Sequence, residues 1–257
     1  MPDLPAFDVL LPLDASARRL EPRADEAELL ALFADGPAVR ANMVTTLDGA
    51  ATGANHVSGS INGPADFRVF RVLRALADVV LIGAGTARGE RYTALEVPDE
   101  LREARAALGL PARLELAVVT ASGELPAELL DSERPPIVLT TGANPSLDEL
   151  RARIGADHVV VADGGVPGSV DPRAVVAALA DRGLVRVLAE GGPTLLAQLL
   201  DADLLDELCL TWSPQLVGGP SGRILGRPSW FSPARPLHLL HADGVLLGRW
   251  RVARLGA

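Results

Sequence analysis

Three short segments of the sequence place glycines beside acids or hydroxyls, and each lies at the end of an apolar run. They are residues 42–49 (Asn-Met-Val-Thr-Thr-Leu-Asp-Gly), 83–86 (Gly-Ala-Gly-Thr) and 190–195 (Glu-Gly-Gly-Pro-Thr-Leu). Glycines let the backbone approach a phosphate or a flat ring, and a threonine adds a hydroxyl donor. Carboxylates such as Asp48 and Glu190 are able to stabilise a cation or relay a proton. These residue types favour a nucleotide site with an acid beside it.

Each segment also has a plainer interpretation. On spacing alone, Thr-Thr-Leu-Asp-Gly is better explained as a turn. Gly-Ala-Gly-Thr lacks the third glycine of the dinucleotide fingerprint, so a tight turn explains it as well. Glu190 taken alone is slightly better explained as a carboxylate that caps the following helix, in which Pro193 stands at the preferred first position. The similar stretch at 162–165, Ala-Asp-Gly-Gly, lacks the proline and threonine and indicates a surface turn.

The elements that must position these segments alternate between strands and helices. Residues 79–82 (Val-Val-Leu-Ile) are an apolar run that leads into Gly83, which is typical of a buried strand. Such alternation predicts an α/β fold with a mostly parallel sheet, which binds ligands outside the carboxyl ends of its strands. Strands are predicted at 39–47, 79–82, 114–120, 137–140, 158–161 and 185–189, and helices at 25–33, 64–77, 98–108, 146–154, 171–181 and 193–200.

The C-terminal part of the chain has a different pattern. Strands are predicted at 207–217, 237–241 and 245–252 with no helix between them, and Ala-Asp-Gly at 242–244 predicts a hairpin turn. This order favours an antiparallel C-terminal edge on the sheet. The proline-rich, charged residues 1–37 are expected to be an N-terminal lead-in segment, and residues 38–257 a single domain.

The helix at 64–77 carries two stripes at helical spacing. An arginine stripe beside the apolar one is better explained as a solvated helix face than as a phosphate site. The apolar stripe is Phe67, Phe70, Leu73 and Ala77, and the arginine stripe is Arg68, Arg71 and Arg74.

Composition excludes several functions. The net charge of −9 argues against non-specific nucleic-acid binding. All 24 basic residues are arginine, so neither a Schiff-base lysine nor a P-loop lysine exists. The single cysteine, Cys209, excludes a disulfide framework and is expected in the core. It also excludes a zinc site of the CxxC type, and we expect no metal site. The chain has neither an apolar run long enough to cross a bilayer nor a basic leader, so we expect a cytoplasmic protein.

Together the three segments resemble the reductase domain of bacterial riboflavin biosynthesis, the C-terminal domain of the bifunctional deaminase-reductase. Residues 43–49 resemble its Met-Ser-Leu-Asp-Gly, and 78–88 resemble its Asp-Ala-x-x-x-Gly-x-Gly-Thr-x-Arg. The block at 190–195, with Val-Gly-Gly at 217–219 downstream, is the most specific part, and the resemblance covers roughly residues 39–252. It implies a dihydrofolate-reductase-like, three-layer fold.

The resemblance also implies roles for individual residues around a bound NADPH. Asp48 and Glu190 would face the substrate as catalytic groups, and Asn42 and Arg88 would bind it. The cofactor-binding residues would be Thr46 and Leu195, then Gly83, Gly85 and Thr86 near the ribose and nicotinamide, and Gly191, Gly192 and Thr194 around the phosphates.

Two features depart from the family pattern. Asn42 stands where relatives usually have a lysine, and Gly-Glu-Arg-Tyr at 89–92 stands where they usually have Asp-Asn-Pro. The deaminase half needs paired zinc-binding cysteines, which one cysteine cannot provide. We therefore expect a stand-alone reductase.

The expected reaction is NADPH-dependent reduction of a ribosylaminopyrimidine phosphate to its ribityl form, as in 5-amino-6-(5-phosphoribosylamino)uracil reduction. The hydride would go to the C1 imine of the opened sugar. A dihydropterin or dihydrofolate-type reductase, or a non-catalytic NADPH-binding protein, remains the alternative. Arginine suits the 2′-phosphate of NADPH. A homodimer is expected because Leu208, Leu210 and Trp212 would otherwise form an exposed apolar edge strand.

Overall fold

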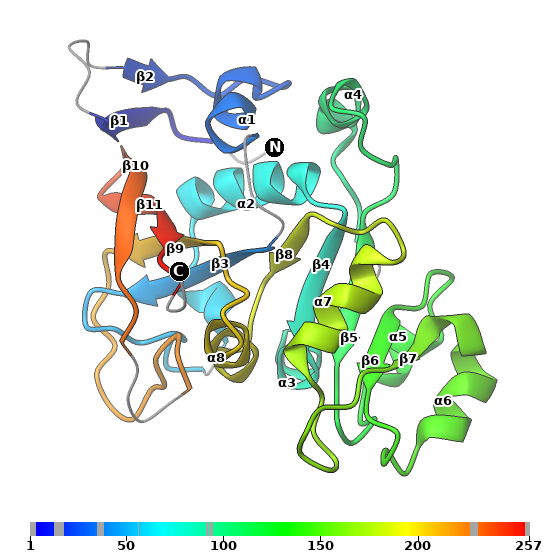
Figure 1. Cartoon of the computed structure of the whole chain (residues 1–257). Helices are drawn as coiled ribbons and strands as arrows, with labels where there is room; N and C mark the ends of the chain where they lie inside the picture. The colour runs from blue at the N-terminus through cyan, green and yellow to red at the C-terminus, as the bar shows by residue number, and fades with distance from the viewer. Residues whose placement is uncertain are drawn as a thin grey trace.

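The computed structural model describes residues 4–12, 18–34, 39–55, 57–90, 92, 95–226 and 231–254 (Figure 1). Its strands are β1 (Phe7–Leu11), β2 (Arg18–Leu20), β3 (Val39–Thr46), β4 (Val79–Gly83), β5 (Glu115–Val119), β6 (Ile137–Thr140), β7 (Val159–Val161), β8 (Val187–Ala189), β9 (Glu207–Ser213), β10 (Ala234–Ala242) and β11 (Val245–Val252). Its helices are α1 (Ala27–Phe33), α2 (Pro64–Leu76), α3 (Ala84–Gly89), α4 (Asp99–Ala107), α5 (Ala127–Leu130), α6 (Leu147–Ile154), α7 (Pro172–Ala180) and α8 (Pro193–Asp201), with 3-10 turns η1 (Ser58–Ser60) and η2 (Ala156–His158).

All the strands belong to one sheet, in the order β2-β1-β10-β11-β9-β3-β8-β4-β5-β6-β7. The strands from β9 to β7 pair in parallel, and those from β2 to β9 pair antiparallel. The predicted α/β class, with a mostly parallel sheet and an antiparallel C-terminal edge, is confirmed. The hairpin predicted at 242–244 joins β10 to β11, with Asp243 and Gly244 at φ values of +50° and +81°.

Helices cover both faces of the sheet because its central strands are apolar on both sides. In β4, Val80 and Ile82 pack with α1, α2 and α4, whereas Val79 and Leu81 pack with α7 and α8. Figure 1 shows α2 lying across one face, with α1 beyond it. This layering places Glu190, the first residue after β8, beside Arg74 in the last turn of α2.

The N-terminal segment contributes two strands and a helix to the same sheet and core. β1 pairs with β10, and β2 pairs with β1. Phe7, Leu20 and Phe33 are buried in the same cluster as α2. Sequence patterning had predicted the helix here, but neither strand, because short edge strands carry a weak alternation signal.

The arginine stripe of α2 is not a solvated face, and that prediction was wrong. Side-chain exposure is 1% for Arg68, 13% for Arg71 and 18% for Arg74. Each guanidinium pairs with a carboxylate that is distant in sequence: Glu26, Glu100 and Glu190 respectively. These partners compensate the charges that burial would otherwise penalise.

β9 is not the edge strand that the homodimer prediction assumed. β9 lies between β11 and β3, so Leu208, Leu210 and Trp212 do not lie on an edge. Their side chains alternate with buried ones and are half-buried on the opposite face of the sheet. Cys209, on the buried face, is a core residue as predicted, and burial raises the pKa of its thiol to about 12.

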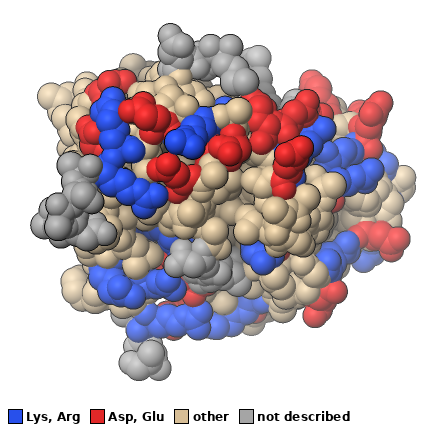
Figure 2. All heavy atoms as spheres, turned by 90° about the horizontal axis from the view of Figure 1, so that it is seen from above, with Lys and Arg blue, Asp and Glu red and all other residues tan. Residues whose placement is uncertain are grey.

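Charged side chains of both signs lie on the surface. On the face shown in Figure 2, arginines and acidic side chains are interspersed. Within the described residues, no helix is long and apolar enough to cross a membrane, and no group of His, Cys, Asp and Glu side chains could hold a metal ion.

Candidate active site

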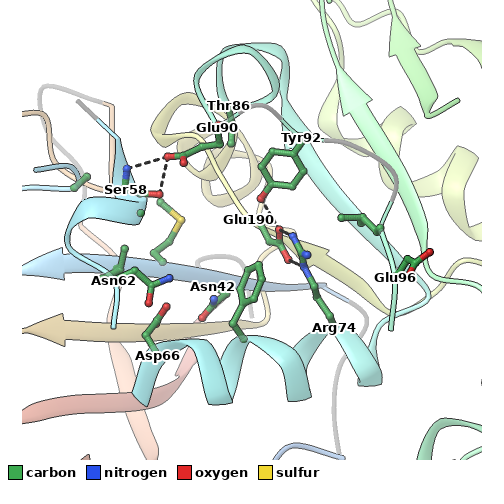
Figure 3. A pocket seen from close by; sticks show the side chains of 16 residues that line it. Asn42, Ser58, Asn62, Asp66, Arg74, Thr86, Glu90, Tyr92, Glu96 and Glu190 are labelled. Carbon is green, nitrogen blue, oxygen red and sulfur yellow. Dashed lines mark hydrogen bonds and ion pairs between the residues drawn. The ribbon is translucent and has the colours of Figure 1, made fainter. Parts of the chain in front are cut away.

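A cavity of about 370 Å³ opens between α2, β3 and the segments that follow β4 and β8 (Figure 3). β3 contributes three of its lining residues and α2 another three, while Glu190 directly follows β8. The cavity therefore lies near the carboxyl ends of parallel strands, where α/β sheets bind ligands. It is lined by Asn42, Met43, Val44, Ala51, Ser58, Gly59, Asn62, Asp66, Phe70, Arg74, Thr86, Glu90, Tyr92, Leu95, Glu96 and Glu190.

One face of α2 supplies a carboxyl group, an aromatic ring and a guanidinium to the cavity. Asp66, Phe70 and Arg74 are four residues apart, so they lie one above another on the helix. Sequence analysis missed Asp66 as a site residue. The four-residue spacing of three chemically distinct side chains was the available signal.

Glu190 is held at one end of the cavity by two partners. The Nε and Nη2 atoms of Arg74 donate to its two carboxylate oxygens at 2.8 and 2.7 Å, and the Tyr92 hydroxyl donates at 2.5 Å (Figure 3). Its side chain is 3% exposed. Glu190 does not cap α8, whose N-terminus has no side-chain cap. The carboxylate is thus oriented by a charged and a neutral donor, and the capping interpretation is wrong.

The ionisation of the two partners follows from this pairing. Burial and the nearby Glu190 charge raise the pKa of Tyr92 well above its usual value. Burial alone would lower the pKa of Arg74, but the hydrogen bonds and charge of Glu190 outweigh it and raise that pKa. Arg74 therefore stays charged and Tyr92 stays a hydrogen-bond donor at neutral pH.

Asp66 is a second buried acid of the cavity. Its exposure is 4%, and the Thr211 hydroxyl on β9 donates a hydrogen bond to it. Burial raises the pKa of Asp66 to about 6, the Glu190 charge adds to the rise, and the Thr211 hydrogen bond opposes it. Asp66 therefore titrates close to physiological pH, which is typical of residues at functional sites.

A third carboxylate, Glu90, fixes the 3-10 turn that borders the cavity. Its Oε1 atom accepts hydrogen bonds from the backbone N–H of Ser58 at 2.9 Å and from the Ser58 hydroxyl at 2.7 Å. Thr86, one turn earlier in α3, also lines the cavity. Glu90 belongs to the segment that departs from the family pattern.

The two glycine turns lie against each other, as expected from the direct pairing of β4 with β8. The Gly83 N–H donates to the Gly191 carbonyl at 2.9 Å. A Cβ on Gly192 would lie 3.0 Å from the Thr86 hydroxyl oxygen, and Gly191 has a φ of +103°, which disfavours other residues. The first turn of α8 is free of a side-chain cap. Bare backbone and an uncapped helix start fit the phosphates of a dinucleotide.

Asp48 lies in the turn after β3 and Thr46 is the last residue of β3; neither lines the cavity. Asp48 is exposed and accepts hydrogen bonds from the Thr46 hydroxyl and from the backbone N–H groups of Val217 and Gly218, the latter at 2.6 Å. These bonds lower the pKa of Asp48, with the Thr46 hydroxyl the largest cause and Gly218 the next. Asp48 joins the turn after β3 to the loop after β9.

The remaining predicted residues lie in different places. Asn42 lines the cavity. Arg88 is outside it and donates to the Glu124 carbonyl at 2.7 Å, so its position does not support substrate binding. Leu195 is buried in the core, Thr194 is exposed in the first turn of α8, and Gly85 lies in α3.

Comparison with known proteins gives a consistent family assignment. Residues 37–243 match the family model described as the RibD C-terminal domain. A 2,5-diamino-6-ribosylamino-4(3H)-pyrimidinone 5′-phosphate reductase from Archaeoglobus fulgidus is 27% identical over 185 residues, which are 71% of this chain and 83% of the relative. A protein of the same name from Methanothermobacter thermautotrophicus is 31% identical over 199 residues, 74% of this chain and 83% of the relative.

Solved structures agree with the fold. A pyrimidine reductase-like protein from Corynebacterium diphtheriae superposes with a TM-score of 0.75 at 27% identity, covering 88% of this chain and 95% of that one. A deaminase/5-amino-6-(5-phosphoribosylamino)uracil reductase from Thermotoga maritima gives a TM-score of 0.63 at 20% identity, covering 84% and 57% of the two chains. The expected fold class, that of the riboflavin-biosynthesis reductases, is confirmed.

Proposed function

The chain belongs to the RibD C-terminal domain family, and from this premise we propose that it is an NADPH-dependent reductase of riboflavin biosynthesis. Its substrate is a ribosylaminopyrimidine phosphate, as the names of the archaeal relatives suggest, and its product is the ribityl form. The observation that carries the proposal is Glu190, which the resemblance placed at the substrate and which lies oriented and buried at the wall of the cavity.

Besides binding the cofactor, the protein must promote two steps of the reaction, ring opening and protonation of the nitrogen. The sugar ring must open to an imine, and the nitrogen must carry a proton while C1 accepts the hydride that a bound nicotinamide supplies. We assign Glu190 to stabilise the protonated imine nitrogen, since its carboxylate is anchored by Arg74 and Tyr92. The Tyr92 hydroxyl, in contact with Glu190, supports a proton relay to the cavity.

The glycine turns support the proposed cofactor site. We propose that Gly83, Gly85 and Thr86 lie along the ribose and nicotinamide, and that the 191–192 turn with Thr194 binds the phosphates. Leu195 acts from the core, where its Cβ lies 3.9 Å from the position of a Cβ on Gly83. Thr46 acts through its turn, because its hydroxyl accepts the Ala50 N–H and donates to Asp48.

Substrate binding is proposed for Asn42 and Arg74. Arg74 is the one guanidinium among the described lining residues, and its bidentate pair with Glu190 uses two of its five N–H groups. The others suit an anionic group of the substrate. Asp48 is proposed to act as a positioning residue, since it ties the turn after β3 to the 217–218 loop.

We propose a homodimer that uses the half-buried face of β9 and β11. Trp212 and Trp250 form an edge-to-face pair there, with ring centroids 6.0 Å apart, over Gly248. Large aromatic side chains such as tryptophan are enriched at the cores of protein interfaces.

The test is oxidation of NADPH by the purified chain, followed by the absorbance of the reduced nicotinamide. The two substrates are 2,5-diamino-6-ribosylamino-4(3H)-pyrimidinone 5′-phosphate and 5-amino-6-(5-phosphoribosylamino)uracil. Turnover with NADPH, and at least about tenfold lower kcat/KM with NADH, supports the proposal. Tight NADPH binding without oxidation in the presence of these substrates would instead support a non-catalytic NADPH-binding protein.

A further inference from the structure

The acid at the α2 end of the cavity, Asp66, has no role in the proposed reaction. It is 4% exposed and it lines the cavity, so its accessible surface faces the space that a ligand would fill. The Thr211 hydroxyl is the one described group that donates to it, and no described guanidinium lies within ion-pair distance. Burying a carboxyl with one neutral donor is unfavourable unless something else donates to it.

The surroundings of Asp66 suit a flat heterocycle. Phe70 lies one turn further along the same helix and offers an aromatic surface. Figure 3 shows the amides of Asn42 and Asn62 on the same side of the cavity as Asp66, apart from the Glu190, Arg74 and Tyr92 group. Carboxamides carry both donors and acceptors, whereas an ionised carboxylate only accepts. This end of the cavity is therefore complementary to a ring edge that presents two adjacent N–H donors.

Two pyrimidines occur in the names of the related reductases, and they differ at this edge. The 2,5-diaminopyrimidinone named for the archaeal relatives carries a 2-amino group beside the N3–H, which makes two adjacent donors. The uracil named for the Thermotoga protein carries a carbonyl at C2, which is an acceptor. A carboxylate accepts two parallel hydrogen bonds from the first edge and faces an oxygen lone pair in the second.

Building on the proposed function, we propose that Asp66 is a specificity-determining residue that selects 2-amino-4-oxopyrimidine substrates over uracil substrates by accepting hydrogen bonds from their 2-amino and N3 groups. The position of Thr211 supports this, because its hydroxyl orients the carboxyl from a different element, β9. The raised pKa of Asp66, about 6, leaves the group ionised above neutral pH, where it accepts but does not donate.

The decisive measurement is kcat/KM for both ribosylaminopyrimidine phosphates at pH 8 with saturating NADPH. We expect the wild type to favour the 2-amino substrate by about a hundredfold or more, because the wrong edge leaves buried polar groups unpaired. Asp66→Asn should lower this ratio at least about tenfold, since a carboxamide is able to donate to the uracil carbonyl and accept from N3–H. Glu96→Gln removes the same charge from another lining residue and should leave the ratio unchanged.

Equal use of the two substrates by the wild type, or a preference for uracil, would overturn the inference. So would an Asp66→Asn variant that is folded by circular dichroism but keeps the wild-type ratio. If Asp66→Asn does not fold, Thr211→Val decides: it keeps the carboxyl but removes the hydroxyl that orients it, and it should lower the ratio severalfold. An unchanged ratio in that variant counts against the proposal.

A binding measurement separates this inference from the proposed function. The 2-amino and uracil ribitylamino phosphates, the reaction products, are titrated into the wild type and Asp66→Asn by calorimetry. If neither substrate is reduced but the 2-amino compound binds about a hundredfold more tightly and loses this advantage in the variant, the proposed reaction is wrong and the assignment of Asp66 stands. Equal binding of the two compounds overturns the assignment whatever the turnover.

Discussion

The Arg68 guanidinium on α2 and the Glu26 carboxylate before α1 form a buried bidentate ion pair, with N–O distances of 2.8 and 2.7 Å. Arg68 also donates to the carbonyls of Pro5, Leu20 and Glu21, so each of its five N–H groups has an acceptor in the N-terminal segment. Because α2 also carries Asp66 and Arg74, the pair ties this segment to the helix that lines the cavity.

Replacing Glu26 should therefore destabilise the whole domain. Glu26→Gln leaves a guanidinium of 1% exposure without its countercharge, and we expect a loss of about 3–5 kcal/mol in the free energy of unfolding. The control is Glu28→Gln, since Glu28 is 43% exposed and pairs with Arg18 at 3.6 Å; its effect should stay below about 1 kcal/mol. Urea denaturation measures both, and equal losses in the two variants would contradict the structural role of Arg68.

Asp66→Asn should change the pH dependence of stability. The folded pKa of Asp66, about 6, lies above the unfolded value of 3.8, so the folded state binds the proton more tightly. Wild-type stability should therefore fall as pH rises from about 4 to 6, by roughly 3 kcal/mol from this group at most. The variant lacks this loss and should be the more stable protein at pH 8, with the advantage reduced at pH 4.5. If the difference in free energy of unfolding between the two proteins does not vary with pH, the raised pKa of Asp66 is refuted.

Glu190→Gln tests the catalytic assignment. The variant should reduce substrate about a hundredfold to ten-thousandfold more slowly in single turnover, because a neutral amide stabilises a cationic nitrogen poorly. The NADPH dissociation constant should stay within a few-fold of the wild type, since the glycine turns are unchanged. Tyr92→Phe, which removes one hydrogen bond to Glu190, should show a smaller slowing. Wild-type turnover in a folded Glu190→Gln protein would remove the assignment.

Asp48→Asn separates positioning from catalysis. Because Asp48 holds backbone N–H groups of the 217–218 loop and lies outside the cavity, we expect a lower melting temperature at pH 7 and turnover within a few-fold of the wild type at saturating NADPH and substrate. The pKa of Asp48 is lowered by folding, so its stabilising contribution is present above about pH 4 and is lost as pH falls through the folded pKa. A turnover slowed a hundredfold with an unchanged melting temperature would restore the catalytic interpretation.

A charged residue introduced on the half-buried face of β9 and β11 tests the proposed dimer. Leu210→Glu places a carboxylate between Met43 and Gly248 on β3 and β11, next to the tryptophan pair. The wild type should show twice the chain mass in light scattering at micromolar concentration, and the variant should show the mass of one chain. Arg182→Glu on the turn after α7 is an exposed control that should leave the mass unchanged. A wild type that scatters as a single chain would exclude the dimer.

Local patterns in the sequence were enough to predict most of the sheet and the turns that hold the site. Apolar runs such as 79–82 are buried on both sides and lead directly into glycines, so their structure follows from burial and backbone freedom within a few residues. The same holds for the predicted strand ends at Gly83 and Glu190, which β4 and β8 bring together.

The partners of the acids were decided by the tertiary structure alone. Glu190 meets Arg74 across 116 residues, and Asp66 meets Thr211 across 145. A single sequence shows that α2 has arginines at helical spacing, but not which carboxylate will compensate them, because that depends on how remote elements pack. The same physical reason explains why the arginine stripe was mistaken for a solvated face and why Asp66 was missed. An ion pair or a buried carboxyl is a property of two surfaces in contact, whereas periodicity reports on one surface at a time.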